Sequence, residues 1–161
     1  MPFLEPCNKL IVERPPLVIH FAEAPLKHFD SHRQTAFWKT ESGGQLFAEI
    51  EGLRWNIVRA TGPRRSDYRR RARFFPSRKH EQSEINESFG AGLHYVGDWH
   101  THPEPHPTPS PLDLESMQDL TLRSAYELPG FLMVIVGTDT TSRGLWISLH
   151  AGTTQYQRLI S

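Results

Sequence analysis

The residue types that could do chemistry gather between Gly97 and Asp113. His100 and His102 stand two apart, so on an extended strand both imidazoles project from one face and can share one metal ion. Asp113 follows after a loop with five prolines, three residues beyond Ser110 and near the start of a predicted helix. The chain has a single cysteine, so histidine and carboxylate must hold any metal. The pattern predicts a zinc site of His100, His102 and Asp113, with the fourth position left for water.

Each part of this pattern also has an ordinary interpretation. A His-x-His pair on a strand is often just part of a polar face, and Ser-Pro-x-Asp is a serviceable capping box for a helix. We assign His94, Glu104 and His106 to such ordinary polar positions. The two motifs are far more specific together, because Pro103 directly follows the second histidine and seven residues separate His102 from the Ser-Pro-x-Asp motif.

Taken in order, His100-Thr-His102-Pro and Ser110-x-x-Asp113 resemble the motif of the JAMM metallopeptidases, a family built on the JAB/MPN domain. Every position of that motif is filled, and the resemblance covers roughly residues 15 to 150. It implies one Zn²⁺ per chain as cofactor, with His100, His102 and Asp113 as ligands. It also implies that the Ser110 hydroxyl donates to the oxyanion of the tetrahedral intermediate.

The same family places a catalytic glutamate after its first helix, just before a glycine-rich strand. Glu41, which precedes Gly43 and Gly44, occupies this position. The resemblance implies that Glu41 is the general base toward a zinc-bound water whose pKa falls toward about 7. Glu49 and Glu51 are the competitors, but both lie farther along the predicted strand, on the face opposite its apolar residues. Glu41 is therefore the preferred base.

The resemblance also indicates a substrate class. JAMM enzymes cleave the isopeptide bond between a ubiquitin-like C-terminus and a lysine, or a peptide bond after such a tail. More narrowly, the runs from Tyr95 to Pro103 and from Pro107 to Asp113 resemble a bacterial branch that includes the deconjugating peptidase of CBASS antiphage operons. The implied partners are a ubiquitin-like modifier or conjugated protein tail, with an operon-encoded activating and conjugating enzyme and a nucleotide cyclase.

A non-catalytic scaffold of the MPN type, binding protein partners or nucleic acid, is the alternative function. Known scaffolds of this type have usually lost motif residues, and here none is missing. Zinc analysis of the purified protein discriminates the two hypotheses, because only the enzyme requires the metal.

The apolar pattern predicts the elements that position these residues. Short strands are expected at 10–12 and 17–21, then a helix at 25–40 on the spacing of Leu26, Phe29, Ala36 and Phe37. Further strands are expected at 45–51, 55–60, 72–75, 93–100, 131–137, 145–150 and 156–160, and further helices at 77–89 and 110–124. The order predicts an α/β (α+β) fold in which helices interrupt a largely antiparallel sheet. The resemblance implies a curved sheet with flanking helices, of the cytidine-deaminase-like kind.

The composition predicts one JAB/MPN domain spanning residues 1–161. Its 37% hydrophobic content can supply one core. No apolar run approaches the roughly 20 residues that span a bilayer, and the N-terminal residues lack the pattern of a signal peptide. The sequence therefore predicts a cytoplasmic protein with no membrane partner.

The formal net charge of zero conceals one basic segment. Residues 59–79 hold nine of the eighteen Lys and Arg residues against a single acid, Asp67. This segment is a solvated loop paired with the glutamates of the next helix, a docking surface for an acidic patch, or a nucleic-acid surface. No recognised nucleic-acid-binding fold surrounds it, so nucleic acid is not the expected partner. The substrate tail is expected to add as a strand to a sheet edge near residues 72–76.

Overall fold

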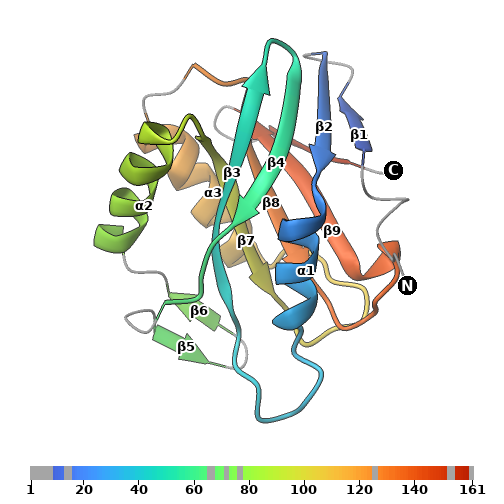
Figure 1. Ribbon diagram of the computed structural model, residues 1–161. Helices are drawn as coiled ribbons and strands as arrows, with labels where there is room; N and C mark the ends of the chain where they lie inside the picture. Colours follow the sequence, from blue (N-terminus) through green and yellow to red (C-terminus); the bar gives the residue numbers. More distant parts are fainter. Residues whose placement is uncertain are drawn as a thin grey trace.

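The computed structural model describes residues 9–12, 16–64, 68–70, 73–75, 78–124, 127–151 and 155–159. Its main feature is one twisted sheet of eight strands in the order β1-β2-β4-β3-β7-β8-β9-β10 (Figure 1). Five of the seven neighbouring pairs are antiparallel, while β2 with β4 and β7 with β8 are parallel. The strands are β1 (Lys9–Val12), β2 (Leu17–Phe21), β3 (Gly43–Glu51), β4 (Arg54–Ala60), β7 (His94–Thr101), β8 (Phe131–Val136), β9 (Leu145–Ala151) and β10 (Gln155–Arg158). The expected α+β fold with a largely antiparallel sheet is confirmed.

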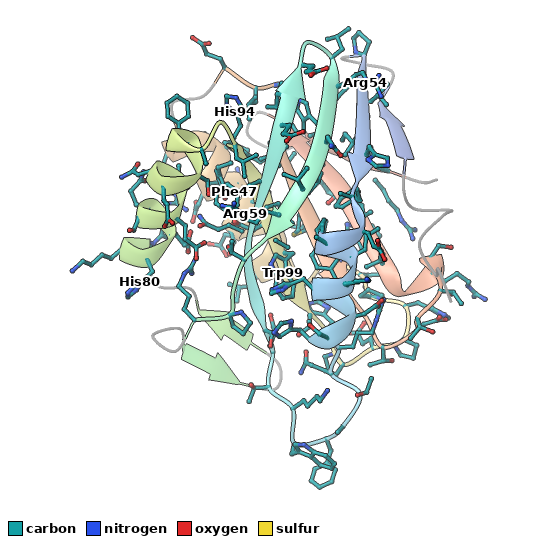
Figure 2. The ribbon with its side chains drawn as sticks, viewed as in Figure 1. Phe47, Arg54, Arg59, His80, His94 and Trp99 are labelled. Atoms are coloured by element: carbon teal, nitrogen blue, oxygen red, sulfur yellow. The ribbon has the colours of Figure 1, made fainter. Side chains whose placement is uncertain are left out.

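Apolar side chains fill both faces of the sheet. The helices are α1 (Glu23–Ser31), α2 (Arg78–Gly90) and α3 (Pro111–Arg123), with a short 3-10 turn η1 (Ser142–Gly144). Along β8, Leu132 and Val134 join the cluster that contains α1, whereas Met133 and Ile135 join the cluster that contains α3. Figure 2 shows Trp99 inside the fold. The alternation along β8 therefore seats α1 and α3 on opposite faces of the sheet.

A glycine fixes the course of β7 just before the histidine pair. Gly97 has a φ of +152°, and a Cβ there would meet Leu132 O at 1.9 Å. The pairing of β3 with β7 shifts register at this point. Beyond the shift the alternation is regular. Trp99 packs toward α1, whereas Asp98 and His100 line a cavity on the face of the sheet that carries α3.

The expected helix at 25–40 is wrong beyond residue 31. α1 ends at Ser31, whose hydroxyl donates to His28 O at 2.8 Å, and His32 N donates to Phe29 O at 3.1 Å. The chain then becomes a loop because the next polar side chains are buried against distant parts of the sheet. Phe37, which the sequence pattern placed on the apolar face of the expected helix, is 79% exposed.

The strand expected at 72–75 is one arm of a hairpin. β5 (Tyr68–Arg70) and β6 (Arg73–Phe75) pair antiparallel, with Tyr68 opposite Phe75, as a separate two-stranded sheet. The side chains of residues 65–77, which make up most of the basic segment, lie outside the described part. Within that part, Arg64 is ion-paired with Glu84 of α2, as the solvated-loop interpretation expects.

None of the helices in the ranges given above is both long and apolar enough to cross a membrane.

Candidate metal centre

Three of the predicted residues meet at the end of β7. The two Nε2 atoms of His100 and His102 lie 3.2 Å apart. Asp113 Oδ1 lies 3.2 Å from His100 Nε2, and Asp113 Oδ2 lies 3.2 Å from His102 Nε2. The three side chains are 11–15% exposed, so they form a recessed polar cluster that remains open on one side.

The backbone places the histidines by clamping the end of β7 on both sides. Thr101 N donates to Ser42 O at 2.8 Å, on the side of β3, and His102 N donates to Val136 O at 2.9 Å, on the side of β8. Pro103 follows and ends the pairing. The two histidines therefore project together from a strand end that is held by both of its neighbours.

Asp113 reaches this cluster because it also caps α3. Ser110 is the N-cap residue. Its hydroxyl accepts from Asp113 N at 3.1 Å, and its backbone N donates to Asp113 Oδ2 at 2.8 Å. This capping box fixes the carboxylate with both oxygens toward the histidines. The structure thus gives Ser-Pro-x-Asp its capping role and its place in the polar cluster at once.

Glu41 approaches the same point from the loop before β3. Its side chain is 4% exposed, and a carboxylate oxygen lies within 4.8 Å of the His100 and His102 nitrogens. Glu49 and Glu51, the competing glutamates, are both exposed. They lie toward the far end of β3, where it pairs with β4. Glu41 is the glutamate that the fold brings to the histidines.

The cluster fits a zinc ion. A tetrahedral ion with ligand bonds of about 2.0–2.1 Å holds its ligand atoms about 3.3–3.4 Å apart. The 3.2 Å contacts of His100 Nε2 with His102 Nε2 and with Asp113 Oδ1 are close to this spacing, while Asp113 Oδ2 faces His102 Nε2. Glu41 also forms a possible metal-binding group with the two histidines, with a carboxylate oxygen within 4.8 Å of their ring nitrogens. Asp113 contacts both histidines at 3.2 Å, which suits it to hold an ion together with them.

The charges of the cluster support anionic Asp113. Burial opposes ionisation of this carboxyl, but hydrogen bonds with His100 and His102 outweigh it and hold the pKa of Asp113 well below its usual range. For His102, burial works against protonation, while the hydrogen bond and charge of Asp113 raise the pKa above its ordinary value. A cation at this point is therefore favourable.

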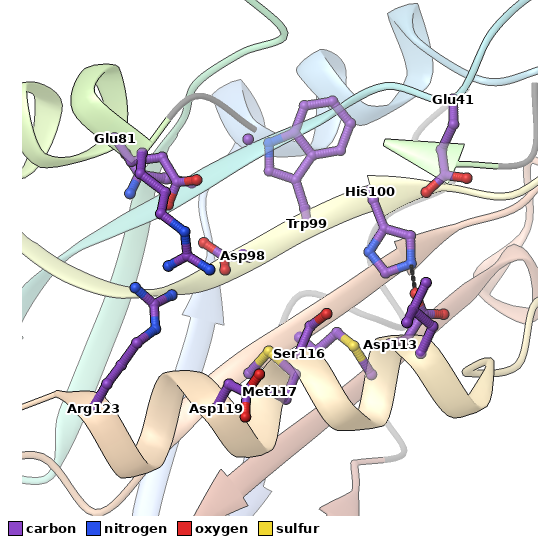
Figure 3. Close-up of a pocket in the computed structure, with 15 residues that line it drawn as sticks. Glu41, Glu81, Asp98, Trp99, His100, Asp113, Ser116, Met117, Asp119 and Arg123 are labelled. Atoms are coloured by element: carbon purple, nitrogen blue, oxygen red, sulfur yellow. Dashed lines mark ion pairs between the residues drawn. The ribbon is translucent and has the colours of Figure 1, made fainter. Parts of the chain in front are cut away.

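A cavity of about 340 Å³ opens beside the metal centre. Figure 3 shows Glu41, His100 and Asp113 at one end of it, and Glu81, Asp98 and Arg123 toward the other. Residues of β3, β7, α2 and α3 line its walls.

Tyr95, Asp98 and His106, three other polar residues near the motif, have ordinary partners. Tyr95 donates to Asp98 Oδ1 at 2.7 Å, and burial raises the pKa of Asp98 to about 7. His106 contacts Asp139 at 3.0 Å. Glu104 Oε1 lies 3.9 Å from His102 Nδ1, too far for a hydrogen bond.

One residue that matters to the site was missed in the sequence. Thr101, fully buried between the two histidines, accepts from Ser42 N at 2.9 Å and donates to Gln34 Oε1 at 2.9 Å. It ties the loop that carries Glu41 to the strand that carries the histidines. Only its place inside the His-x-His motif could have drawn attention to it.

Two histidines at a strand end, an aspartate from the capping box of the next helix and a glutamate from the loop before β3 thus meet at one point. The family described as prokaryotic homologues of the JAB domain matches residues 25–148. The chain belongs to this family.

Three relatives carry the name "CD-NTase/cGAS isopeptidase". The protein from Escherichia coli (strain TW11681) is 33% identical over 121 residues, which are 73% of this chain and 72% of the relative. The protein from Vibrio cholerae serotype O1 is 37% identical over 110 residues, covering 66% and 68%. The protein from Pseudomonas aeruginosa is 32% identical over 142 residues, covering 86% of each.

Solved structures share the fold at lower identity. A protein of Desulfitobacterium hafniense superposes with a TM-score of 0.61 at 16% identity, over 87% of this chain and 88% of the other. A protein of Salinibacter ruber gives a TM-score of 0.52 at 22% identity, over 86% of each chain.

Proposed function

We propose that this chain is a zinc-dependent isopeptidase that releases a CD-NTase, or another protein joined through its C-terminal tail, in CBASS-like antiphage defence. The observation that carries the proposal is the set of 3.2 Å contacts among His100, His102 and Asp113, with Glu41 beside them. The names of the relatives support the choice of substrate.

His100, His102 and Asp113 would hold the ion. Zinc, when bound, lowers the pKa of a coordinated water and polarises the substrate carbonyl. Glu41 takes a proton from the attacking water as the C–O bond forms, and delivers it to the amine nitrogen as the C–N bond breaks. The burial of Glu41 suits this shuttle, because a carboxylate with little water around it passes its proton to the nearest basic atom.

Ser110 is proposed as the donor to the oxyanion. Its hydroxyl oxygen accepts from Asp113 N through a lone pair, which leaves the hydroxyl proton available for a second hydrogen bond. Its position as the N-cap of α3 fixes the hydroxyl next to the carboxylate ligand.

The tail of the substrate is proposed to lie extended in the cavity beside the metal centre. Among the residues that the structure describes, β6 pairs with β5 alone, so its other edge can take an added strand. The cavity walls from α2 and α3 would then hold the side chains of the tail.

The test is cleavage of a purified fusion in which a CD-NTase is followed, after its C-terminal residue, by a reporter protein. The zinc-loaded wild type should release the reporter, and Glu41→Gln should lower the rate about 100-fold to 10,000-fold with its zinc content unchanged. Glu49→Gln, exposed on β3, the strand that follows Glu41, is the matched control and should cleave normally. Cleavage by Glu41→Gln at the wild-type rate would show that Glu41 is not the base.

A further inference from the structure

His102 has one ring nitrogen at the metal centre and one that the centre does not use. Its Nε2 lies 3.2 Å from His100 Nε2 and 3.2 Å from Asp113 Oδ2, so Nε2 is the nitrogen that can bind an ion. Its Nδ1 is buried and has no hydrogen-bond partner among the residues that the structure describes. Most buried polar side-chain atoms have at least one partner, so this nitrogen requires an explanation.

Metal binding through Nε2 turns Nδ1 into an obligatory donor. A neutral imidazole carries one proton for its two nitrogens, so a ring that gives the lone pair of Nε2 to a metal ion keeps its proton on Nδ1. Histidines that bind metal ions almost always donate this second N–H to a carboxylate, a backbone carbonyl or water. His102 therefore needs an acceptor beside Nδ1 once an ion is bound.

Glu104 has a carboxylate close to the required position. Its Oε1 lies 3.9 Å from His102 Nδ1, about 1 Å beyond the usual length of an N–H···O hydrogen bond. The gap is also narrow for a bridging water, which needs room for two bonds of about 2.8 Å each. The Glu104 side chain is 55% exposed, so it can rotate toward the ring without displacing packed neighbours.

The backbone of Glu104 is held in place beneath this exposed side chain. Thr138 N donates to Glu104 O at 2.9 Å, which ties the loop after β7 to the turn after β8. Gly137 allows this close approach, because a Cβ at that position would lie 2.5 Å from Glu104 O. A change of side-chain torsions is therefore enough to bring the carboxylate to His102.

We propose that Glu104 is a positioning residue for His102, and that its carboxylate accepts the Nδ1–H of His102 when Nε2 holds zinc. This hydrogen bond fixes the orientation of the imidazole and makes it a more basic ligand. The inference rests on the proposed function, in which His102 binds the ion. It gives Glu104 a role beyond the ordinary polar position expected from the sequence.

The affinity for zinc, measured by competition with a chromophoric chelator, tests this role without any substrate. Glu104→Ala should weaken zinc binding about tenfold to a hundredfold. Glu104→Gln keeps an acceptor oxygen at the same position and should lose less. Glu115→Ala, which removes an exposed carboxylate of α3 two positions after Asp113, is the matched control and should bind zinc as the wild type does.

Two further measurements separate positioning from a general effect on the fold. Urea unfolding of the chelator-treated proteins should be the same for Glu104→Ala and the wild type, because at 3.9 Å the hydrogen bond is absent without the metal. In NMR spectra of zinc-loaded protein with isotope-labelled histidine, the Nδ1–H of His102 should exchange slowly with water in the wild type. The same proton should exchange faster in Glu104→Ala.

Three results would overturn the role of Glu104. They are zinc affinity in Glu104→Ala equal to that of the wild type, an equal loss of affinity in Glu115→Ala, and a chelator-treated Glu104→Ala that is less stable than the wild type. A wild type that binds no zinc would contradict both this role and the proposed function. Because zinc binding needs no substrate, failure of the zinc-loaded wild type to cleave the CD-NTase fusion would count against the proposed function alone.

Discussion

Two carboxylates at the metal centre differ in how they are held. Asp113 contacts both histidines at 3.2 Å and accepts from Ser110 N, so its oxygens are fixed and its pKa is lowered. Glu41 enters from a loop, with a carboxylate oxygen within 4.8 Å of the histidine nitrogens. A ligand must be rigid and anionic, whereas a base must take up and release a proton. The two surroundings suit these two tasks in that order.

Substitution of Ser110 can separate its capping of α3 from its proposed role as a donor to the oxyanion. Ser110→Gly should lower kcat about 100-fold to 1,000-fold, because the oxyanion loses a donor. The free energy of unfolding should fall by only a few tenths of a kcal/mol, since glycine is tolerated at an N-cap. Urea unfolding measures the change in stability. Cleavage of a C-terminal peptide of a CD-NTase, with a fluorogenic amide at its end, measures the change in kcat. Ser110→Thr, which keeps the hydroxyl, is the control, and a Ser110→Gly enzyme with normal kcat would limit Ser110 to capping.

The sequence was most informative about site residues that lie close together in the chain. His100, His102, Ser110 and Asp113 lie within fourteen consecutive positions of one run, so spacing alone placed them together. The bonds of Thr101 to Gln34 and Ser42 join positions 67 and 59 residues apart. No local pattern marks such contacts, because they exist only after β3 and β7 pair.

Among the elements, the loop from His32 to Ser42 shows what local pattern cannot decide. Apolar spacing favoured a continuous helix to residue 40, but α1 ends at Ser31. The buried contacts of Arg33 with Gly137, just after β8, and of Gln34 with Thr101 of β7 replace the helical hydrogen bonds. Tertiary contacts thus override helix propensity in the segment that delivers Glu41.

Substitution of Thr101 tests how the loop that carries Glu41 is joined to β7. Thr101→Val removes the partner of Gln34 and Ser42, and a buried polar group without its partner costs about 1–3 kcal/mol. We expect the free energy of unfolding to fall by that amount and kcat to fall with it, while bound zinc stays stoichiometric. Denaturant unfolding, peptide cleavage and metal analysis measure the three quantities. Thr101→Ser should behave as the wild type, and loss of zinc from Thr101→Val would show that Thr101 serves the histidines instead.

Strand β9 contains a buried network that makes stability depend on pH. Trp146 Nε1 donates to Ser148 Oγ at 3.0 Å, and Ser148 Oγ contacts His150 Nε2 at 2.8 Å. Burial lowers the pKa of His150 to about 4, against about 6.5 in an unfolded chain. The folded state therefore binds fewer protons, and stability present above about pH 6.5 is lost as the pH falls toward about 4.

Protonation of His150 should lower the free energy of unfolding by about 3 kcal/mol between about pH 6.5 and about pH 4. Urea unfolding at a series of pH values, for the wild type and for His150→Gln, measures the contribution of His150 to this pH dependence. The variant should lose less stability than the wild type between about pH 6.5 and about pH 4. Parallel pH profiles for the two proteins would contradict the assignment of His150.

In the whole molecule, the metal centre connects parts that lie far apart in the chain. Its residues come from the loop before β3, the end of β7 and the first turn of α3. The general order of elements was predictable, because each strand and helix has its own apolar period. The pairing of β7 between β3 and β8, which assembles the centre, is long-range and became visible only in the fold.

This connection predicts that zinc stabilises the folded state. At a free zinc concentration of 100 times Kd, binding adds about 2.7 kcal/mol to the free energy of unfolding, which raises Tm by roughly 5–10 °C. Thermal unfolding of the chelator-treated protein, with and without added zinc, measures the shift. His100→Ala should abolish it, and an equal shift in that variant would place the bound metal elsewhere.

The most direct test of the account is the position of the cut. The zinc-loaded wild type and Glu41→Gln are incubated with the CD-NTase fusion, and the masses of the products are determined. The account predicts one cut directly after the C-terminal residue of the CD-NTase by the wild type, and intact fusion with Glu41→Gln. An intact fusion with the zinc-loaded wild type, or the same products from Glu41→Gln, would contradict it.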